Sequence, residues 1–250
     1  MKIGLIGSGN MARAVARGWG RPVLCTDPIA ERAQALAAEV GGEALATNAE
    51  VAQRADLVVL CHKPAQLAAV AEELAPHAKA VASILAATSL AALKESYPGK
   101  PVYRFIPSLP VEVKQGAVVQ ADGPAQDAAT DEAVSELFAE LGALVVLPDG
   151  LVDVAMGLMS CAPAYVALVA EAQIDAGVRR GIPAAQGAEL VVQTLAGTAE
   201  LLRQRGNDTV AIRREVTSPG GLTARGLDAL ERGGIRAAFS DALDAVLEKR

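Results

Sequence analysis

Apolar residues in the first 148 positions fall into short continuous runs, most of them followed by a stretch with helical periodicity. We predict strands at residues 2–6, 23–26, 56–61, 80–85, 102–106, 116–120 and 143–147. Between them we predict helices at residues 11–19, 28–40, 64–74, 90–96 and 128–141, with a further short helix that starts at Asn48. Strands that alternate with helices in this way form a parallel sheet through right-handed crossovers.

Beyond Pro148 the strand-like runs end and long helical patterns take over. The expected helices cover residues 152–180, 183–205, 210–215, 222–230 and 235–247. We therefore divide the chain into an α/β domain over residues 1–148 and an all-α domain over residues 149–250. The stretches 164–178 and 188–202 are apolar on more faces than one helix buries in a monomer of this size. We therefore expect the helical domain to form a homodimer.

The connection after the first strand reads Gly-Ser-Gly-Asn-Met-Ala over residues 7–12 and opens a helix. Gly7 permits a sharp turn, Gly9 lets the backbone approach a pyrophosphate, and Ala12 keeps the helix close to the sheet. The N–H groups at the start of that helix would then hold the anion. Such glycines also occur in ordinary turns, but their place between a strand and a helix favours a Rossmann-type dinucleotide-binding domain.

Two further strand ends carry residues that suit a dinucleotide. Asp27 ends the second strand, 20 residues after Gly7, where an acidic residue is expected to hydrogen-bond the adenosine ribose. Its carboxylate would repel a 2′-phosphate, so we expect NADH to be preferred over NADPH. The positive charge of Arg32 would allow the site to accept both cofactors. Lys63 and its neighbours follow the strand at 56–61 and are expected to face the cofactor.

A second glycine-rich stretch, Val-Thr-Ser-Pro-Gly-Gly-Leu-Thr, occupies residues 216–223 in the helical half. We interpret Ser218 as the N-cap of a helix and Pro219 as its first residue. Gly221 and the glycine before it leave backbone N–H groups uncovered, and Thr223 adds a hydroxyl, which together suit a small carboxylate. The alternative is an ordinary capped helix whose glycines serve close packing.

Composition limits the partners of the chain. It has 250 residues, 52% of them hydrophobic, and a formal net charge of −6. No basic block is present, so we expect neither nucleic acid nor an anionic membrane as a partner. No apolar run reaches the ~20 uninterrupted residues that a membrane helix needs. Three widely spaced cysteines, at positions 25, 61 and 161, indicate buried reduced thiols in a cytoplasmic protein, with no metal-binding spacing.

A dinucleotide site and a carboxylate site in one chain indicate hydride transfer to a small carboxylic acid. The two histidines, His62 and His77, have no recognisable carboxylate partner in the sequence, so an acid/base pair of the hydroxyacid dehydrogenase type is unsupported. A protonated imine is already an electrophile, and its reduction needs no protein acid. The residue inventory therefore suits imine reduction.

Several motifs of this sequence are similar to those of the pyrroline-5-carboxylate reductase family. The resemblance rests on residues 7–12, 63–64, 162–165, 171–178 and above all on Val-Thr-Ser-Pro-Gly-Gly with Thr223. It covers nearly the whole chain. It implies a Rossmann domain followed by a helical domain that interlocks two subunits, often assembled into a ring of dimers. It further implies that NADH or NADPH reduces 1-pyrroline-5-carboxylate, a cyclic imino acid, to proline.

The resemblance also implies roles for individual residues. Ser218, Gly221 and Thr223 of the catalytic site would hold the substrate carboxylate. The residues that would bind the cofactor are Gly7, Ser8, Gly9, Asn10, Met11, Asp27, Asn48, Cys61, His62 and Lys63. Among them, the stretch at positions 10 and 11 would bind the pyrophosphate, position 48 would lie near the adenosine, and positions 61–63 would contact the nicotinamide side.

Two motifs depart from the family pattern. Ser108 and Leu109 stand where the family has asparagine and threonine, and Ser160 and Ala162 replace two glycines on either side of Cys161. These changes alter the shape and polarity of the pocket expected for the substrate ring. Two alternatives therefore stay open: a related reductase of another cyclic imino acid or small oxo acid, and a non-catalytic sensor that binds NAD(P).

Overall fold

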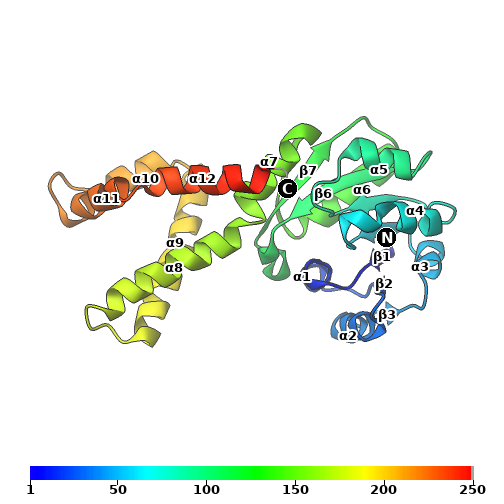
Figure 1. Cartoon of the computed structure of the whole chain (residues 1–250), viewed down its shortest axis with the longest axis horizontal. Helices are drawn as coiled ribbons and strands as arrows, with labels where there is room; N and C mark the ends of the chain where they lie inside the picture. Colours follow the sequence, from blue (N-terminus) through cyan, green and yellow to red (C-terminus); the bar gives the residue numbers. More distant parts are fainter. Residues whose placement is uncertain (249–250) are drawn as a thin grey trace. The chain divides into compact units, whose positions relative to one another are not determined.

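The computed structural model describes residues 1–248. Its chain divides into two compact units, the first covering Met1–Pro163 and the second beginning at Ala164. Figure 1 shows the order of their elements along the chain. The boundary expected from the sequence, between residues 148 and 149, lies before helix α7 (Val152–Met159), whose Val152 and Ala155 pack on the sheet of the first unit.

In the described residues, the first unit contains one eight-stranded sheet with the strand order β3-β2-β1-β4-β5-β6-β7-β8. Its strands are β1 (Ile3–Ile6), β2 (Leu24–Thr26), β3 (Glu43–Ala44), β4 (Leu57–Leu60), β5 (Val81–Ser83), β6 (Val102–Pro107), β7 (Gly116–Asp122) and β8 (Gly142–Pro148). The strand order reverses between β1 and β4. In open α/β sheets ligands bind outside the carboxyl ends of the strands at such a point.

Helices of the first unit cover the two faces of this sheet. They are α1 (Asn10–Trp19), α2 (Ala30–Val40), α3 (Asn48–Arg54), α4 (Leu67–Leu74), α5 (Leu90–Ser96), α6 (Ala128–Ala139) and α7, with short 3₁₀ turns η1 (Pro64–Gln66), η2 (Leu109–Val113) and η3 (Asp149–Leu151). Leu5, Phe105 and Phe138 belong to the core on one face, and Leu60 and Tyr97 to the core on the other. Gly41 ends α2 as expected, because it adopts the left-handed conformation at φ +67° that commonly terminates a helix.

The predicted alternation of strands and helices is confirmed for most of the sheet, but two features differ. Strand β7 runs antiparallel to β6, because only residues 108–115 connect them and a parallel crossover needs a longer segment. The short strand β3, which pairs with β2, was not predicted. Both strands lie on the outer parts of the sheet, away from the reversal between β1 and β4.

The predicted single helix over residues 152–180 is wrong. Two helices occupy it, α7 and α8 (Ala162–Val178), with a break at Ser160 and Cys161. Pro163 explains the break, because it has no N–H to continue the hydrogen-bond ladder of α7.

Asp149–Val178 is the one described helical stretch that is long and apolar enough to cross a membrane by length and composition alone.

The second unit consists of helices in the part that the structure describes. After α8 these are α9 (Ala184–Gln204), α10 (Thr209–Glu215), α11 (Leu222–Arg232) and α12 (Ile235–Leu247). Large apolar side chains on them are exposed, among them Leu168 at 62%, Leu190 at 60% and Leu222 at 81%. This unit therefore keeps much of its apolar surface uncovered within one chain, as the sequence pattern indicates for a surface that meets a second subunit.

Candidate functional site

The glycine loop between β1 and α1 has the backbone geometry of an anion-binding turn. Gly7 has a φ of +100°, and a Cβ atom there would lie 2.9 Å from the carbonyl oxygen of Cys61. Gly9 is the N-cap of α1, and apart from Gly9 and its two chain neighbours no atom of the described residues lies within 4 Å of the position its Cβ would occupy. The first N–H groups of α1 have no acceptor within the helix. The loop therefore leaves an open approach to uncovered N–H groups, as a pyrophosphate requires.

Ser8 and Asp27 lie side by side at the ends of β1 and β2. The Ser8 amide donates to the Asp27 carboxylate over 2.9 Å, and the Ser8 hydroxyl donates to the Thr26 carbonyl over 3.1 Å. The second carboxylate oxygen of Asp27 accepts the amide of Ile29, also at 2.9 Å. Asp27 is thus held in one orientation beside the glycine loop, where it can accept a hydrogen bond from a ribose hydroxyl.

Asn48 and Met11 make contacts within the protein that the sequence does not indicate. The Asn48 side chain accepts the Thr26 hydroxyl at 2.6 Å and donates to Glu73 at 2.9 Å, so its amide is already engaged beside the end of β2. Met11 is half-buried and packs on the core, whereas the neighbouring Asn10 is exposed. At positions 10 and 11, backbone N–H groups are therefore the main donors available to a pyrophosphate.

The segment after β4 places Cys61, His62 and Lys63 beside the glycine loop. Burial raises the pKa of the Cys61 thiol and lowers the pKa of His62. The Nδ1 atom of His62 lies 2.9 Å from the Lys63 carbonyl, whereas its Nε2 atom is buried and has no partner among the described residues. With Nδ1 protonated, Nε2 offers a lone pair that a cofactor donor group can satisfy. Cys61 and Cys161 are half-buried rather than buried, unlike Cys25.

These observations test whether the first unit fits a dinucleotide. An open glycine cradle, a helix start without a side-chain cap, a fixed carboxylate and an unpartnered ring nitrogen all lie around the carboxyl ends of β1, β2 and β4. Each matches a group of the cofactor: the pyrophosphate, the ribose hydroxyls, or a further donor. The residues present therefore fit such a cofactor.

Residues 216–223, where the carboxylate site is expected, lead into α11, but the helix starts later than expected. The helix begins at Leu222 with Gly221 as its N-cap, so Ser218 is not the N-cap and Pro219 is not the first helical residue. The reason is the left-handed conformation of Gly220, at φ +67°, which makes a turn whose Gly221 amide donates to the Ser218 carbonyl at 3.0 Å. Residues 216–221 of the motif therefore precede the helix, and the three residues 219–221 do not enter it.

The corrected geometry still brings Ser218 to the start of α11. A Cβ atom on Gly221 would lie 2.3 Å from the Ser218 hydroxyl oxygen, so only glycine leaves that hydroxyl in its place. Thr223 lies in the first turn of the helix and is exposed. Two hydroxyls and the uncovered N–H groups of one helix start are thus close enough in the chain to bind a single carboxylate.

Comparison with known proteins agrees with both parts of this description. Residues 149–250 match the family model described as pyrroline-5-carboxylate reductase dimerisation, and residues 2–87 match that of NADP oxidoreductase, coenzyme F420-dependent. The pyrroline-5-carboxylate reductase of Thermus thermophilus is 36% identical over 259 residues, which cover 100% of this chain and 97% of that protein. This chain belongs to the pyrroline-5-carboxylate reductase family.

Other members of the family give the same result. Pyrroline-5-carboxylate reductase 3 of Macaca fascicularis is 33% identical over 255 residues, covering 98% of this chain and 93% of that protein. The structure of 1-pyrroline-5-carboxylate reductase from Streptococcus pyogenes superposes with a TM-score of 0.89 at 28% identity, covering 98% of this chain and 96% of that one. The expected fold, a Rossmann-type α/β domain followed by a helical dimerisation domain, and the expected oxidoreductase class are confirmed.

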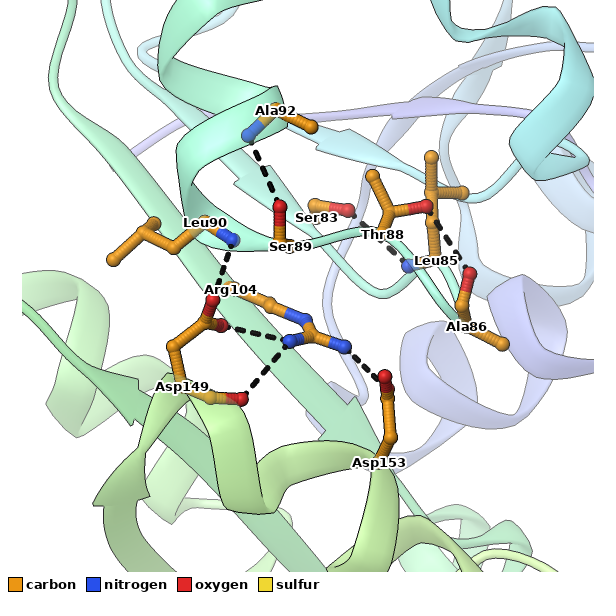
Figure 2. Close-up of polar contacts among 10 residues, drawn as sticks. All are labelled: Ser83, Leu85, Ala86, Thr88, Ser89, Leu90, Ala92, Arg104, Asp149 and Asp153. Carbon is orange, nitrogen blue, oxygen red and sulfur yellow. Dashed lines mark hydrogen bonds and ion pairs between the residues drawn. The ribbon is translucent and has the colours of Figure 1, made fainter. Parts of the chain in front are cut away.

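In this reductase a buried arginine forms an ionic cluster with two carboxylates, and sequence reasoning missed it. The side chain of Arg104 in β6 is only 2% exposed and contacts Asp149 at 2.7 Å and Asp153 at 2.5 Å. Asp149 also accepts the Leu90 amide at 3.0 Å, as Figure 2 shows. An arginine within the apolar run 102–106 was the available signal, because a charge in a buried strand needs partners.

Proposed function

We propose that this chain reduces 1-pyrroline-5-carboxylate to proline with a nicotinamide cofactor as hydride donor. The observation that carries the proposal is the relationship over the whole chain, 36% identity with the Thermus thermophilus reductase across 100% of these residues. The structure of a Plasmodium falciparum pyrroline carboxylate reductase with NADP bound superposes with a TM-score of 0.87 at 25% identity, covering 98% of this chain and 95% of that one.

Residues of the first unit would hold the cofactor. The N–H groups at the start of α1 bind its pyrophosphate, Gly9 leaves room for that approach, and Asp27 accepts a ribose hydroxyl. His62, Lys63 and Cys61 contact its nicotinamide side, and Asn48 lies towards its adenosine. When bound, the reduced cofactor supplies a hydride.

Residues of the second unit would hold the substrate. The hydroxyls of Ser218 and Thr223 and the uncovered N–H groups after Gly221 bind the carboxylate of the imino acid and fix its orientation. The imine nitrogen takes its proton from solvent before reduction, so no side chain needs to act as an acid. Burial also lowers the pKa of His62.

We further propose that NADH is preferred over NADPH. The support is Asp27, whose fixed carboxylate would face the 2′-phosphate of NADPH without a counter-charge of its own. Arg32, which is exposed on α2, would supply a cation that lets the protein tolerate NADPH as well. The preference therefore follows from the charge at the end of β2.

We also propose a homodimer formed through the helical unit, in the cytoplasm, with the ring of dimers implied by the family resemblance as the alternative assembly. The exposed apolar residues of α8 and α9 and the dimerisation match over residues 149–250 support the dimer. The unpaired thiols of Cys25, Cys61 and Cys161 suit a reducing compartment. Light scattering of the purified protein would report the mass of the assembly.

A panel of substrates tests the proposed reaction. Purified protein is given NADH or NADPH with 1-pyrroline-5-carboxylate, a six-membered cyclic imino acid, or a small 2-oxo acid, and the loss of reduced cofactor is followed. The proposal expects the highest kcat/KM with 1-pyrroline-5-carboxylate. A higher value with another compound would favour the alternative reductase, for which Ser108, Leu109 and Ser160 are the motivation. Cofactor binding without any turnover would favour the non-catalytic sensor.

A further inference from the structure

Asn48, the first residue of α3, joins the end of strand β2 to helix α4 through its side-chain amide. Its Oδ1 atom accepts the hydroxyl of Thr26, the last residue of β2, at 2.6 Å. Its Nδ2 atom donates to the carboxylate of Glu73 in α4 at 2.9 Å. Thr26 is buried and Asn48 is half-buried. Three elements that are separate in the sequence therefore meet at this one amide.

Glu73 determines which way this amide faces. An ionised carboxylate accepts hydrogen bonds and has no proton to donate, so the group of Asn48 that meets Glu73 must be the NH₂ group. A hydroxyl such as that of Thr26 can donate or accept, and it would tolerate either orientation. The direction of both polar groups of Asn48 therefore depends on its charge-assisted bond to Glu73.

The backbone of Asn48 is fixed independently of Glu73. Thr47 is the N-cap of α3, and its hydroxyl accepts the Glu50 amide at 3.2 Å. The Glu50 carboxylate in turn accepts the Thr47 amide at 3.2 Å. This capping box holds the start of α3 whether or not the Asn48 side chain is bonded. Loss of the Glu73 carboxylate would therefore change the orientation of one side chain and leave the helix start in place.

The amide of Asn48 lies on the adenosine side of the glycine loop. Thr26 immediately precedes Asp27, whose carboxylate accepts the Ser8 amide and is the expected acceptor of the adenosine ribose. The Ser8 hydroxyl also donates to the Thr26 carbonyl, so the end of β2 is tied to the loop twice. In the part of the chain that the structure describes, Asn48 keeps one N–H and one lone pair without a partner. One donor and one acceptor are therefore left for a ligand beside Asp27.

We propose that Glu73 is a positioning residue for the cofactor: it fixes the orientation of the Asn48 amide, whose remaining N–H and lone pair bind the adenosine half. The inference rests on the nicotinamide cofactor of the proposed function. Glu73 acts through Asn48 and does not touch the reacting atoms. It therefore contributes to the affinity for the adenosine half of the cofactor and not to hydride transfer.

Binding of two nucleotides tests the proposal. The probes are NADH and ADP-ribose, which share the adenosine half, and the proteins are wild type, Glu73→Gln and Glu72→Gln. A glutamine at position 73 can donate or accept, so it no longer selects one orientation of the amide. We expect Glu73→Gln to raise both Kd values about fivefold, the size of one hydrogen bond. Glu72→Gln is the matched control, because it removes an exposed charge from the same helix and should leave both Kd values unchanged.

A double-mutant cycle shows whether Glu73 acts through Asn48. Asn48→Ala removes the amide, so adding Glu73→Gln to it should raise the Kd of ADP-ribose no further. Additive effects of the two substitutions would overturn the positioning role. An unchanged Kd in Glu73→Gln, or an equal rise in Glu72→Gln, would overturn it too.

Nucleotide binding also separates this inference from the proposed function, because it is measured without an imino acid. A wild type that binds both nucleotides and does not reduce 1-pyrroline-5-carboxylate would contradict the proposed function, and the comparison of Kd values would still stand. A wild type that binds neither NADH nor ADP-ribose would overturn the inference itself.

Discussion

The amide N–H of Ser8 donates to the carboxylate of Asp27 over 2.9 Å, which joins the glycine loop after β1 to the end of β2. The two residues are 19 positions apart in sequence. This bond orients the one acidic side chain that would meet the adenosine ribose, and it fixes the place of a negative charge. Cofactor choice is the property that this relationship controls most directly.

Replacing Asp27 should shift the cofactor preference. We expect wild type to show a higher kcat/KM with NADH than with NADPH, and Asp27→Ser to lower the NADH/NADPH ratio by about tenfold or more, because the repulsion is removed and a ribose acceptor is lost. Glu31→Gln, which neutralises an exposed carboxylate in the first turn of α2, is the control. A wild type with clearly higher kcat/KM for NADPH would disprove the account of Asp27.

Substituting the two glycines of the loop should affect different properties, protein stability at Gly7 and cofactor affinity at Gly9. Gly7→Ala places a Cβ atom at φ +100° and 2.9 Å from the Cys61 carbonyl oxygen, so it should lower the free energy of unfolding by about 2 kcal/mol. Gly9→Ala meets no described protein atom within 4 Å, so stability should change by less than about 1 kcal/mol while the cofactor Kd rises about tenfold. Urea unfolding and fluorescence titration with NADH measure the two effects. Equal cofactor affinity in Gly9→Ala and wild type would contradict a pyrophosphate above Gly9.

Removing Arg104 should be costly, because two carboxylates lose their buried partner. We expect Arg104→Leu to lower the free energy of unfolding by about 3 kcal/mol. Arg21→Ala, which removes a surface pair with Glu140, should cost less than about 1 kcal/mol. Urea denaturation of both variants provides the comparison, and similar losses in the two would show that the ionic cluster adds little to stability.

Tyr97 should make stability fall at alkaline pH. Its side chain is 0% exposed, its hydroxyl has no partner among residues 1–248, and burial raises its pKa. A tyrosine whose pKa is raised in the folded state stabilises the fold below the unfolded value of about 10, and that contribution is lost as pH rises above it. Tyr97→Phe should therefore lose less stability than wild type between about pH 9 and 11. Urea unfolding at both pH values tests this, and parallel losses would contradict it.

Local signals in the sequence sufficed for most of the fold and for the position of the candidate residues. The apolar runs located β1, β2, β4, β5 and β6, and the glycine loop and Asp27 lie at the strand ends where the sequence placed them, because each depends on a few adjacent residues. The direction of β7 and the turn at Gly220 were harder to predict. The direction of β7 follows from the short connection 108–115, which the pattern of apolar runs alone does not take into account. The turn at Gly220 depends on a backbone conformation that residue type does not determine alone.

Long-range contacts account for what the sequence did not predict. Ser160 and Pro107 are 53 positions apart, and Arg104 and Asp149 are 45 apart. No periodicity connects such residues, since they meet only when α7 packs on the sheet. The same limit applies to the substituted residues Ser108 and Ser160, whose hydrogen bonds to Ala117 and Pro107 become apparent only in the structure.

The most direct measurement is the KM for 1-pyrroline-5-carboxylate in wild type and Thr223→Ala. If the start of α11 holds the substrate carboxylate, wild type turns over and loss of the Thr223 hydroxyl raises KM about tenfold, the size of one hydrogen bond to a charged group. The Kd for NADH stays unchanged, and Thr198→Ala, an exposed threonine on α9, behaves as wild type. Turnover with the same KM in Thr223→Ala, or a wild type that binds NADH and does not reduce this imine, would contradict the account.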